Sequence, residues 1–231
     1  NKEFNCSLLD RSNEFSLLAI QGPKAESFCQ NFTDENLSLL KNYSFVIGKF
    51  AGCEKIIISK TGYTGSGGYE LYIPNNRALK IWDDLFSYDD SNLKPIGLAA
   101  RDTLRIEMGY CLYGNDINEQ TSTEEANLGW ITKTQTNFIG SDAIEKQIRS
   151  GIRRKLVGFK LNEKSIPRNG YEVYSSEKGL IGKVTSGTFS PILKIGIGLA
   201  YIDINHLDDE FILIKIRDKF VNSMIVKTPF I

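Results

Sequence analysis

Histidine and closely spaced cysteines are scarce in this sequence, and their scarcity excludes two kinds of site. The chain has one histidine, His206, and its four cysteines, Cys6, Cys29, Cys53 and Cys111, lie far apart without a C-x-x-C pair. A zinc site of the usual ligand spacing is therefore not expected. A disulfide framework is not expected either, because 231 residues suffice to build a core. His206 lies in a polar stretch between β-rich runs, which favours a surface-loop residue over a catalytic triad member.

An excess of charge of one sign and long apolar runs are also absent. Lysine and arginine together number 28, as do aspartate and glutamate, so the formal net charge is zero. No strong field is available to attract nucleic acid or an anionic membrane. No apolar run approaches membrane-spanning length, and no Walker A or G-x-S-x-G run occurs. We therefore expect no nucleic-acid partner and no membrane partner, and the scattered thiols fit a reducing compartment.

The first part of the chain carries strand and helix signals in turn. The run Phe15–Ile20 predicts a strand, and the turn residues 21–23 lead into apolar residues at helical spacing up to Cys29. β-branched residues at 56–58, a glycine-rich stretch from Thr61 to Gly68 and the run 69–73 then predict a hairpin. Asn75 or Asn76 is expected to cap a helix. Its predicted apolar face comprises Ala78, Leu79, Trp82, Leu85 and Phe86.

The second part of the chain changes character near residue 150. Before it, a helix is predicted over Leu98–Met108, ending at Gly109. After it come short strand-like runs with turn signals between them, which predict a small all-β barrel or sandwich. These runs are 156–159, 171–174, 181–184, 197–202 and 211–216. We therefore expect an α+β fold with a boundary near Ser150-Gly151, giving domains over 1–150 and 151–231.

The predicted hairpin places one carboxylate where a flat ligand could lie. Strand alternation puts Tyr69, Leu71 and Ile73 on one face and Glu70 with Tyr72 on the other. A single carboxylate can accept two parallel N–H bonds, such as those offered by the edge of a pterin ring. The tyrosines Tyr63 and Tyr110 could stack on such a ring. The alternative is that Glu70 is an ordinary exposed strand residue and Tyr63 covers the hairpin.

The predicted helix that starts near Leu98 offers further charged candidates. Arg101 and Arg105 share a helix face, and Asp102 can pair with Arg105. Either this is a salt-bridged surface helix, or Arg101 reaches a ligand carbonyl or carboxylate. Asp102 and Asp116 are candidate acids for proton transfer, although the sequence identifies no partner for either. Cys111 lies between large neighbours, which favours a packed structural thiol over a reactive one.

Several motifs in one order resemble the aminomethyltransferase (T-protein) family of the glycine cleavage system. The resemblance runs nearly from end to end, so it is more specific than any single motif. It rests on Leu18–Pro23, Ser59–Glu70, Gly97–Glu107, Cys111–Ile117, Gly129-Trp130, Phe138–Gly140 and Gly182–Pro191.

This resemblance implies a fold, a reaction and a set of ligand contacts. The fold would be a folate-binding aminomethyltransferase-type domain followed by a small C-terminal β-barrel domain. The reaction would transfer the methylene of a lipoyl-bound aminomethyl group, carried on the H-protein, to tetrahydrofolate with release of ammonia. Tetrahydrofolate would be the co-substrate, with no metal, and Tyr63, Glu70, Arg101 and, more weakly, Tyr110 would contact it. The implied location is the cytoplasm, or the mitochondrial matrix in a eukaryote.

Two alternatives of the same fold stay open. One is a folate-dependent demethylase that passes a methyl group to tetrahydrofolate. The other is a non-catalytic folate-binding protein, although the run Met108–Asp116 fits poorly to the cysteine motif of the related iron–sulfur assembly factors.

The sequence also departs from the family pattern. The family's key aspartate lies in an N-terminal segment, and nothing before Phe15 matches that segment. We therefore expect a chain that lacks the N-terminal part of the family and holds no catalytic residue, so that it is inactive alone. Ser66 stands where the family usually has an acid, and Lys60 where it has arginine. An exposed apolar surface, an unpaired strand edge and self-association are expected to follow.

Overall fold

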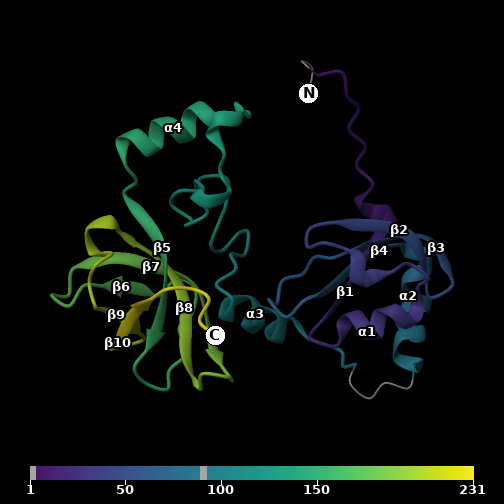
Figure 1. Ribbon diagram of the computed structural model, residues 1–231. Coiled ribbons are helices and arrows are strands. Elements are labelled where there is room, and N and C mark those ends of the chain that lie inside the picture. The colour runs from purple at the N-terminus through teal and green to yellow at the C-terminus, as the bar shows by residue number, and fades with distance from the viewer. Residues whose placement is uncertain (1–3, 89–92) are drawn as a thin grey trace. The chain divides into compact units, whose positions relative to one another are not determined.

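The chain folds into two compact units of different architecture. The computed structural model describes residues 4–88 and 93–231 (Figure 1). Contacts between residues divide it into one unit over 1–96 and another over 97–231. A sheet with helices forms the first unit, and a helix followed by a closed barrel forms the second, so the expected α+β class is confirmed. The domain boundary that the sequence predicts near residue 150 stays a prediction.

The first unit is built on a four-stranded antiparallel sheet in the order β1-β4-β3-β2. Its strands are β1 (Phe15–Gln21), β2 (Phe45–Phe50), β3 (Cys53–Ser59) and β4 (Gly68–Pro74). The helices α1 (Ala25–Cys29) and α2 (Asn75–Ser87) contact β1 and β4. Short 3-10 turns cover Ser12–Glu14, Gln30–Phe32 and Leu37–Leu39. The predicted strands near 15–20, 56–58 and 69–73 and both predicted helices are confirmed, whereas β2 was not predicted.

One face of this sheet forms the core of the unit. Tyr69, Leu71 and Ile73 of β4 are buried, as the alternation predicts, and Ile81 and Leu85 of α2 pack in the same cluster. The predicted apolar face of α2 is wrong in part, because Leu79, Trp82 and Phe86 are exposed. Helical geometry explains the difference, since positions 78, 81 and 85 share one stripe and Leu79 lies outside it.

The predicted asparagine cap of α2 is also wrong. The helix begins one residue earlier than expected, with Pro74 at the N-cap and Asn75 inside the first turn. The Asn75 side chain instead forms hydrogen bonds with β1 and with the segment just before it. Its Oδ1 accepts from the Ser16 hydroxyl at 2.7 Å, and its Nδ2 donates to the Asn13 carbonyl at 2.7 Å. Asn75 therefore fastens the start of α2 to the first strand.

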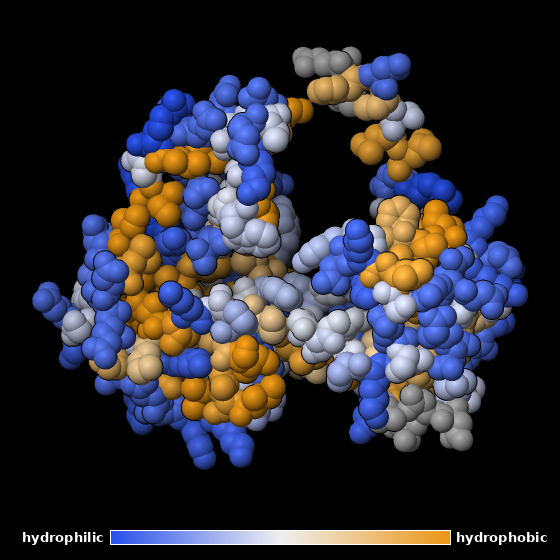
Figure 2. Space-filling view, in the orientation of Figure 1, coloured by the Kyte–Doolittle hydropathy of each residue, from blue (hydrophilic) through white to orange (hydrophobic). Residues whose placement is uncertain are grey.

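The opposite face of the sheet is open and largely apolar. Cross-strand pairing aligns Leu17, Tyr72, Ile57 and Ile47 in one row across all four strands. Leu17 is 52% exposed and Ile47 58% exposed, and Phe45 on the edge strand β2 is exposed as well. Figure 2 shows apolar areas at the surface of both units. The apolar surface and the unpaired strand edge that the sequence predicts are therefore present in this unit, while self-association stays a prediction.

The second unit begins with helix α3 and ends with a closed six-stranded barrel. Helix α3 (Leu98–Glu107) contacts strands β7 and β8 of the barrel. The barrel order is β10-β5-β8-β7-β6-β9. Its strands are β5 (Arg154–Leu161), β6 (Glu172–Tyr174), β7 (Leu180–Ser190), β8 (Ile195–Asp203), β9 (Phe211–Ile216) and β10 (Lys219–Val226). A further helix, α4 (Ser141–Ser150), and β10 were not predicted from the sequence.

The barrel interior is filled by aliphatic and aromatic side chains from every wall, including Phe159, Val184 and Ile214. This packing confirms the barrel alternative of the sequence-based prediction. His206 lies in the polar segment between β8 and β9, where its Nδ1 is 2.7 Å from an Asp209 carboxylate oxygen. Within residues 4–88 and 93–231, no helix has the length and apolar character needed to cross a membrane.

Candidate functional site

The β3–β4 hairpin carries two of the four predicted site residues, Tyr63 and Glu70. Strand pairing brings Ile57, Ile58 and Ser59 opposite Tyr72, Leu71 and Glu70. Three glycines have positive φ here: Gly65 and Gly67 in the loop between the strands, and Gly68 at the start of β4. These φ values lie in regions that glycine adopts without steric cost. The glycine-rich sequence therefore forms a tight loop around Tyr63 and ends directly at the strand that bears Glu70.

Glu70 lies half-buried on the open face of the sheet. The Thr61 hydroxyl donates a hydrogen bond to Glu70 Oε2, and Ser59 Oγ lies 3.1 Å from Thr61 Oγ1. The neighbour of Glu70 on the same face is the exposed ring of Tyr72, whereas Tyr69 and Leu71 point into the core. An oriented carboxylate beside an aromatic ring on an open sheet face can accept two N–H donors from the edge of a flat ligand.

Gln21 holds the hairpin loop in place, a role that was not predicted from the sequence. Its Nε2 donates to the Thr61 carbonyl at 3.2 Å, and its Oε1 accepts from the Thr64 hydroxyl at 3.2 Å. A Cβ at Gly62 would lie 1.9 Å from Gln21 Oε1, so a larger residue there would displace the Gln21 amide from these bonds. Gln21 thus forms hydrogen bonds with residues both before and after Tyr63 in the chain. A glutamine at a strand end does not reveal a partner forty residues away.

The other two predicted residues, Arg101 and Tyr110, belong to the second unit. Arg101 is exposed in the first half of α3, and Tyr110 is exposed just after the helix ends. Arg105, one turn beyond Arg101, is in contrast only 1% exposed. The expected pairing of Asp102 with Arg105 is confirmed, with Arg105 Nε donating to Asp102 Oδ1 at 2.7 Å. Because Arg105 is buried, α3 is more than a salt-bridged surface helix.

Asp116 is the second carboxylate partner of Arg105. Arg105 Nη1 donates to Asp116 Oδ2 at 2.7 Å, and both side chains are buried. The same guanidinium therefore pairs with Asp102, as the sequence predicted, and with Asp116, whose pairing with Arg105 the sequence did not predict. A carboxylate engaged in a buried ion pair serves as a structural anchor, because releasing its charge partner would leave an uncompensated charge. Nothing in this geometry favours Asp116 as a proton-transfer acid.

Cys111, next to Tyr110, packs as the sequence suggested. It contacts the apolar cluster around Ile106, Leu156 and Leu199. Burial raises the pKa of the Cys111 thiol to about 11, and the nearby Asp116 charge acts in the same direction. A thiol with so high a pKa is a poor nucleophile near neutral pH. The residue is therefore a structural one.

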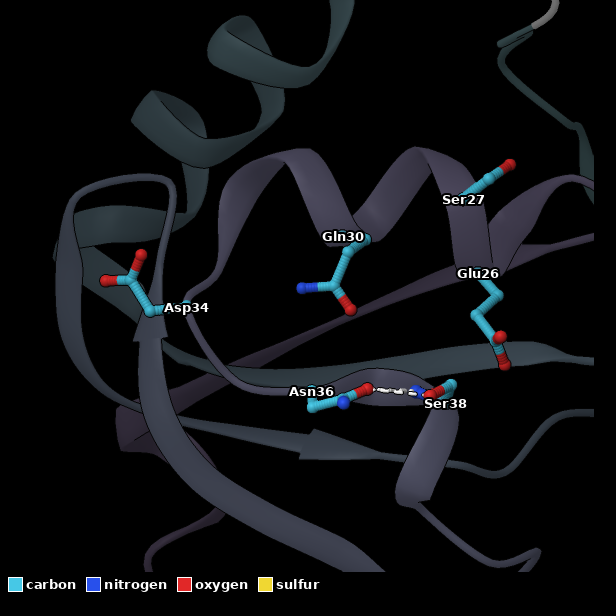
Figure 3. Close-up of a pocket in the computed structure, with 6 residues that line it drawn as sticks. All are labelled: Glu26, Ser27, Gln30, Asp34, Asn36 and Ser38. Carbon is cyan, nitrogen blue, oxygen red and sulfur yellow. Dashed lines mark hydrogen bonds between the residues drawn. The ribbon is translucent and has the colours of Figure 1, made fainter.

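A separate polar hollow of about 540 Å³ lies beside α1 and is lined by Glu26, Ser27, Gln30, Asp34, Asn36 and Ser38. Figure 3 shows Asp34 and Glu26 at opposite ends of this hollow, so the two carboxylates do not converge. The Gln30 amide is engaged with backbone groups of Thr33, Glu35 and Leu37. Among the described residues, no group of three or more histidine, cysteine, aspartate or glutamate side chains could hold a metal ion.

Comparison with known proteins adds two family-model matches. The model of the GCVT N-terminal domain matches residues 1–136. The model of the glycine cleavage T-protein C-terminal barrel domain matches residues 154–231, which include all six barrel strands. The first match alone spans more than half of the chain.

Curated relatives match nearly all of this chain, but the chain covers only part of them. An aminomethyltransferase of Flavobacterium psychrophilum is 48% identical over 232 residues, covering 100% of this chain and 64% of the relative. An aminomethyltransferase of Bacteroides fragilis is 49% identical, covering 96% of this chain and 63% of the relative. The chain thus spans somewhat less than two thirds of the length of these proteins.

The fold also matches a solved structure. The crystal structure of glycine cleavage system aminomethyltransferase T from Bartonella henselae superposes with a TM-score of 0.73 at 23% identity. The match covers 94% of this chain and 84% of that one. At this level of identity the similarity supports the architecture, with its mixed sheet-and-helix unit and its barrel.

Proposed function

We propose that this chain, which belongs to the glycine cleavage T-protein family, provides the tetrahydrofolate-binding part of an aminomethyltransferase. The reaction would transfer the methylene of a lipoyl-bound aminomethyl group to tetrahydrofolate and release ammonia. The donor would be a lipoylated H-protein, and a cytoplasmic location belongs to the same proposal. Two curated relatives named aminomethyltransferase, at 48% and 49% identity, support this reading.

The observation that carries the proposal is the placement of Glu70. Its carboxylate lies on the open sheet face, oriented by the Thr61 hydroxyl, with the exposed Tyr72 ring beside it. The pterin ring of tetrahydrofolate offers a ring N–H and an amino group side by side, which one carboxylate can accept together. Tyr63, in the loop that Gln21 braces, would contribute an aromatic face.

For the second unit we propose Arg101 as a folate contact, with Tyr110 as the weaker candidate. Both are exposed, and both lie in or beside the run Gly97–Glu107 whose sequence resembles the family. A guanidinium is suited to the carbonyl and carboxylate groups of folate, which accept hydrogen bonds in a plane. This part of the proposal is independent of the hairpin contacts.

Tetrahydrofolate binding to the full chain, measured by isothermal titration calorimetry without oxygen, tests the hairpin assignment. Glu70→Gln keeps the shape of the side chain but removes the charge, and we expect it to weaken binding at least tenfold, because hydrogen bonds to charged groups contribute about 1.5–3 kcal/mol. Glu54→Gln is the matched control, since Glu54 is an exposed glutamate of β3 in the same sheet. Equal affinity of Glu70→Gln and wild type would refute the pocket assignment.

Donor specificity separates aminomethyl transfer from the other folate chemistries. The chain would be incubated with tetrahydrofolate and either an aminomethyl-lipoyl carrier or methylated nitrogen and sulfur donors. Ammonia release from the first donor supports the aminomethyltransferase, and transfer from the others supports a demethylase. Binding of tetrahydrofolate without turnover of any donor would agree with the expectation that this chain is inactive alone, and would leave it the folate-binding part of the enzyme.

A further inference from the structure

A buried, hydrogen-bonded polar cluster in the second unit surrounds Arg105. Its guanidinium is buried and donates to four partners on three segments of the chain. Nε donates to Asp102, Nη1 donates to Asp116 at 2.7 Å and to the Tyr110 carbonyl at 3.0 Å, and Nη2 donates to the Ser186 hydroxyl at 2.8 Å. The planar fork of arginine is the only side chain able to serve all of these acceptors at once.

Asp116 carries the other half of the cluster. Besides Arg105, its Oδ2 accepts from the Leu112 backbone N–H at 2.9 Å and from the Ser186 hydroxyl at 2.8 Å. Its Oδ1 accepts from the Thr185 hydroxyl, and its main-chain carbonyl accepts from the Tyr201 hydroxyl at 2.9 Å. The loop that follows α3 is therefore tied by the Asp116 carboxylate to strand β7 and by the Asp116 main-chain carbonyl to strand β8.

The hydrogen bonds of the Arg105–Asp116 pair define the orientation of the loop backbone around Cys111, which an apolar contact would not do. The Tyr110 carbonyl and the Leu112 N–H are both engaged by the ion pair, so the backbone on either side of Cys111 is held at two points. Arg101 lies one helical turn before Arg105 on the same helix. A buried ion pair contributes little net stability compared with well-packed apolar residues of the same volume. Its specific bonds therefore point to a role in positioning the loop.

We propose that Arg105 and Asp116 are positioning residues that hold Tyr110 and its loop against α3 and thereby set the folate affinity contributed by the second unit. The folate part of this inference rests on the proposed function. The positioning part stands on the hydrogen bonds alone and can be measured without a ligand. Neither residue itself contacts the folate.

The test compares Arg105→Met/Asp116→Leu with wild type. The double variant removes both charges together and keeps similar volume, so it leaves no uncompensated charge in the interior. Hydrogen exchange by mass spectrometry over residues 108–117 is the ligand-free readout. We expect protection in this segment to fall at least tenfold while the segment over 180–203, in β7 and β8, stays protected. Unchanged protection over 108–117 would overturn the inference.

The ligand readout is tetrahydrofolate affinity, with a destabilised control. Ile214→Val shortens a fully buried barrel side chain and lowers stability without touching the cluster. We expect the double variant to bind at least fivefold more weakly than wild type and Ile214→Val to bind as wild type does. If the double variant binds as tightly as wild type, the role in affinity is wrong.

Two outcomes are kept apart by this design. If wild type itself does not bind tetrahydrofolate but the loop loses protection in the double variant, the proposed function fails and the positioning role holds. If the double variant does not fold, Arg105→Lys replaces it, because lysine keeps the charge but cannot serve four acceptors in one plane. Wild-type protection and wild-type affinity in Arg105→Lys would then overturn the inference.

Discussion

Replacing Gly68 with alanine should destabilise the first unit far more than replacing its neighbour Gly67. Gly68 has φ +140°, and a Cβ built there would lie 2.2 Å from the Ile20 carbonyl oxygen and 2.8 Å from the Gln21 Cα. Both contacts are backbone atoms of the paired strand β1, so no side chain can move aside. Gly67 also has a positive φ, +76°, but a Cβ there meets nothing within 4 Å.

The two costs can be estimated separately. Alanine at Gly67 destabilises the fold only through its backbone conformation, by about 1–2 kcal/mol. Alanine at Gly68 destabilises it by about 1–3 kcal/mol through a conformation that glycine alone adopts readily. It must also separate the β1–β4 pair at Gln21, which costs about 1 kcal/mol for each hydrogen bond lost. We therefore expect a loss of about 4 kcal/mol for Gly68→Ala and about 1 kcal/mol for Gly67→Ala.

Urea unfolding followed by Trp82 fluorescence measures this difference. Trp82 belongs to α2 in the first unit, and a Trp130→Phe background removes the other tryptophan, which is largely exposed in the second unit. The comparison uses the difference in free energy of unfolding between the two alanine variants. Equal losses for Gly67→Ala and Gly68→Ala would refute the claim that a backbone clash at the β1–β4 pair dictates glycine before Glu70.

Three further predictions concern the surface, the barrel and the acid limb of stability. Ile47→Lys should reduce self-association with little change in the free energy of unfolding, because Ile47 is exposed on the open sheet face. Sedimentation velocity measures this, and an unchanged size distribution would contradict the prediction. Ile214→Ala should cost about 2–4 kcal/mol in urea unfolding, and a loss below about 1 kcal/mol contradicts the barrel packing. Lys60 donates to Glu26 and lowers the pKa of its carboxyl below 4.5, so this stabilisation is present at neutral pH and lost as pH falls below that value. Glu26→Gln should therefore flatten the loss of melting temperature between pH 6 and pH 3.5 slightly, since a partly exposed pair contributes about 0.5 kcal/mol or less.

Elements with a regular apolar pattern could be predicted from the sequence, and elements that depend on a distant partner could not. Strands β1, β4 and β9 alternate or run apolar over their whole length, and each was expected near its observed bounds. Strand β10 was missed because Asn222 and Ser223 interrupt its apolar pattern. Ser223 is completely buried, and its hydroxyl donates to the Val221 carbonyl. A core position is therefore occupied by a polar residue whose hydrogen bond is local, and the apolar pattern of the sequence does not reveal it.

The same distinction applies to the candidate site. Alternation alone places Glu70 on the face opposite Leu71, so the orientation of that carboxylate followed from the sequence. The residues that orient the Glu70 carboxylate could not be predicted. Thr61 donates to Glu70 and Gln21 donates to Thr61, and both bonds depend on the course of a loop that the sequence does not define. Arg105 shows the limit most clearly, since helical spacing identified its bond to Asp102 but not its bond to Ser186, 81 residues along the chain.

A chain whose site residues rest on such distant contacts should lose ligand affinity through residues that never touch the ligand. Gln21 and Arg105 are examples in the two units, because each donates one hydrogen bond to a backbone carbonyl at or near a candidate contact. Gln21 donates to Thr61, two residues before Tyr63, and Arg105 donates to Tyr110 itself. Removing either donor would leave the contact residue in place but release the backbone that carries it. A small displacement of a binding group is enough to lose most of a directional hydrogen bond. Substitutions at these two positions therefore measure how far recognition depends on the frame that holds the contact residues.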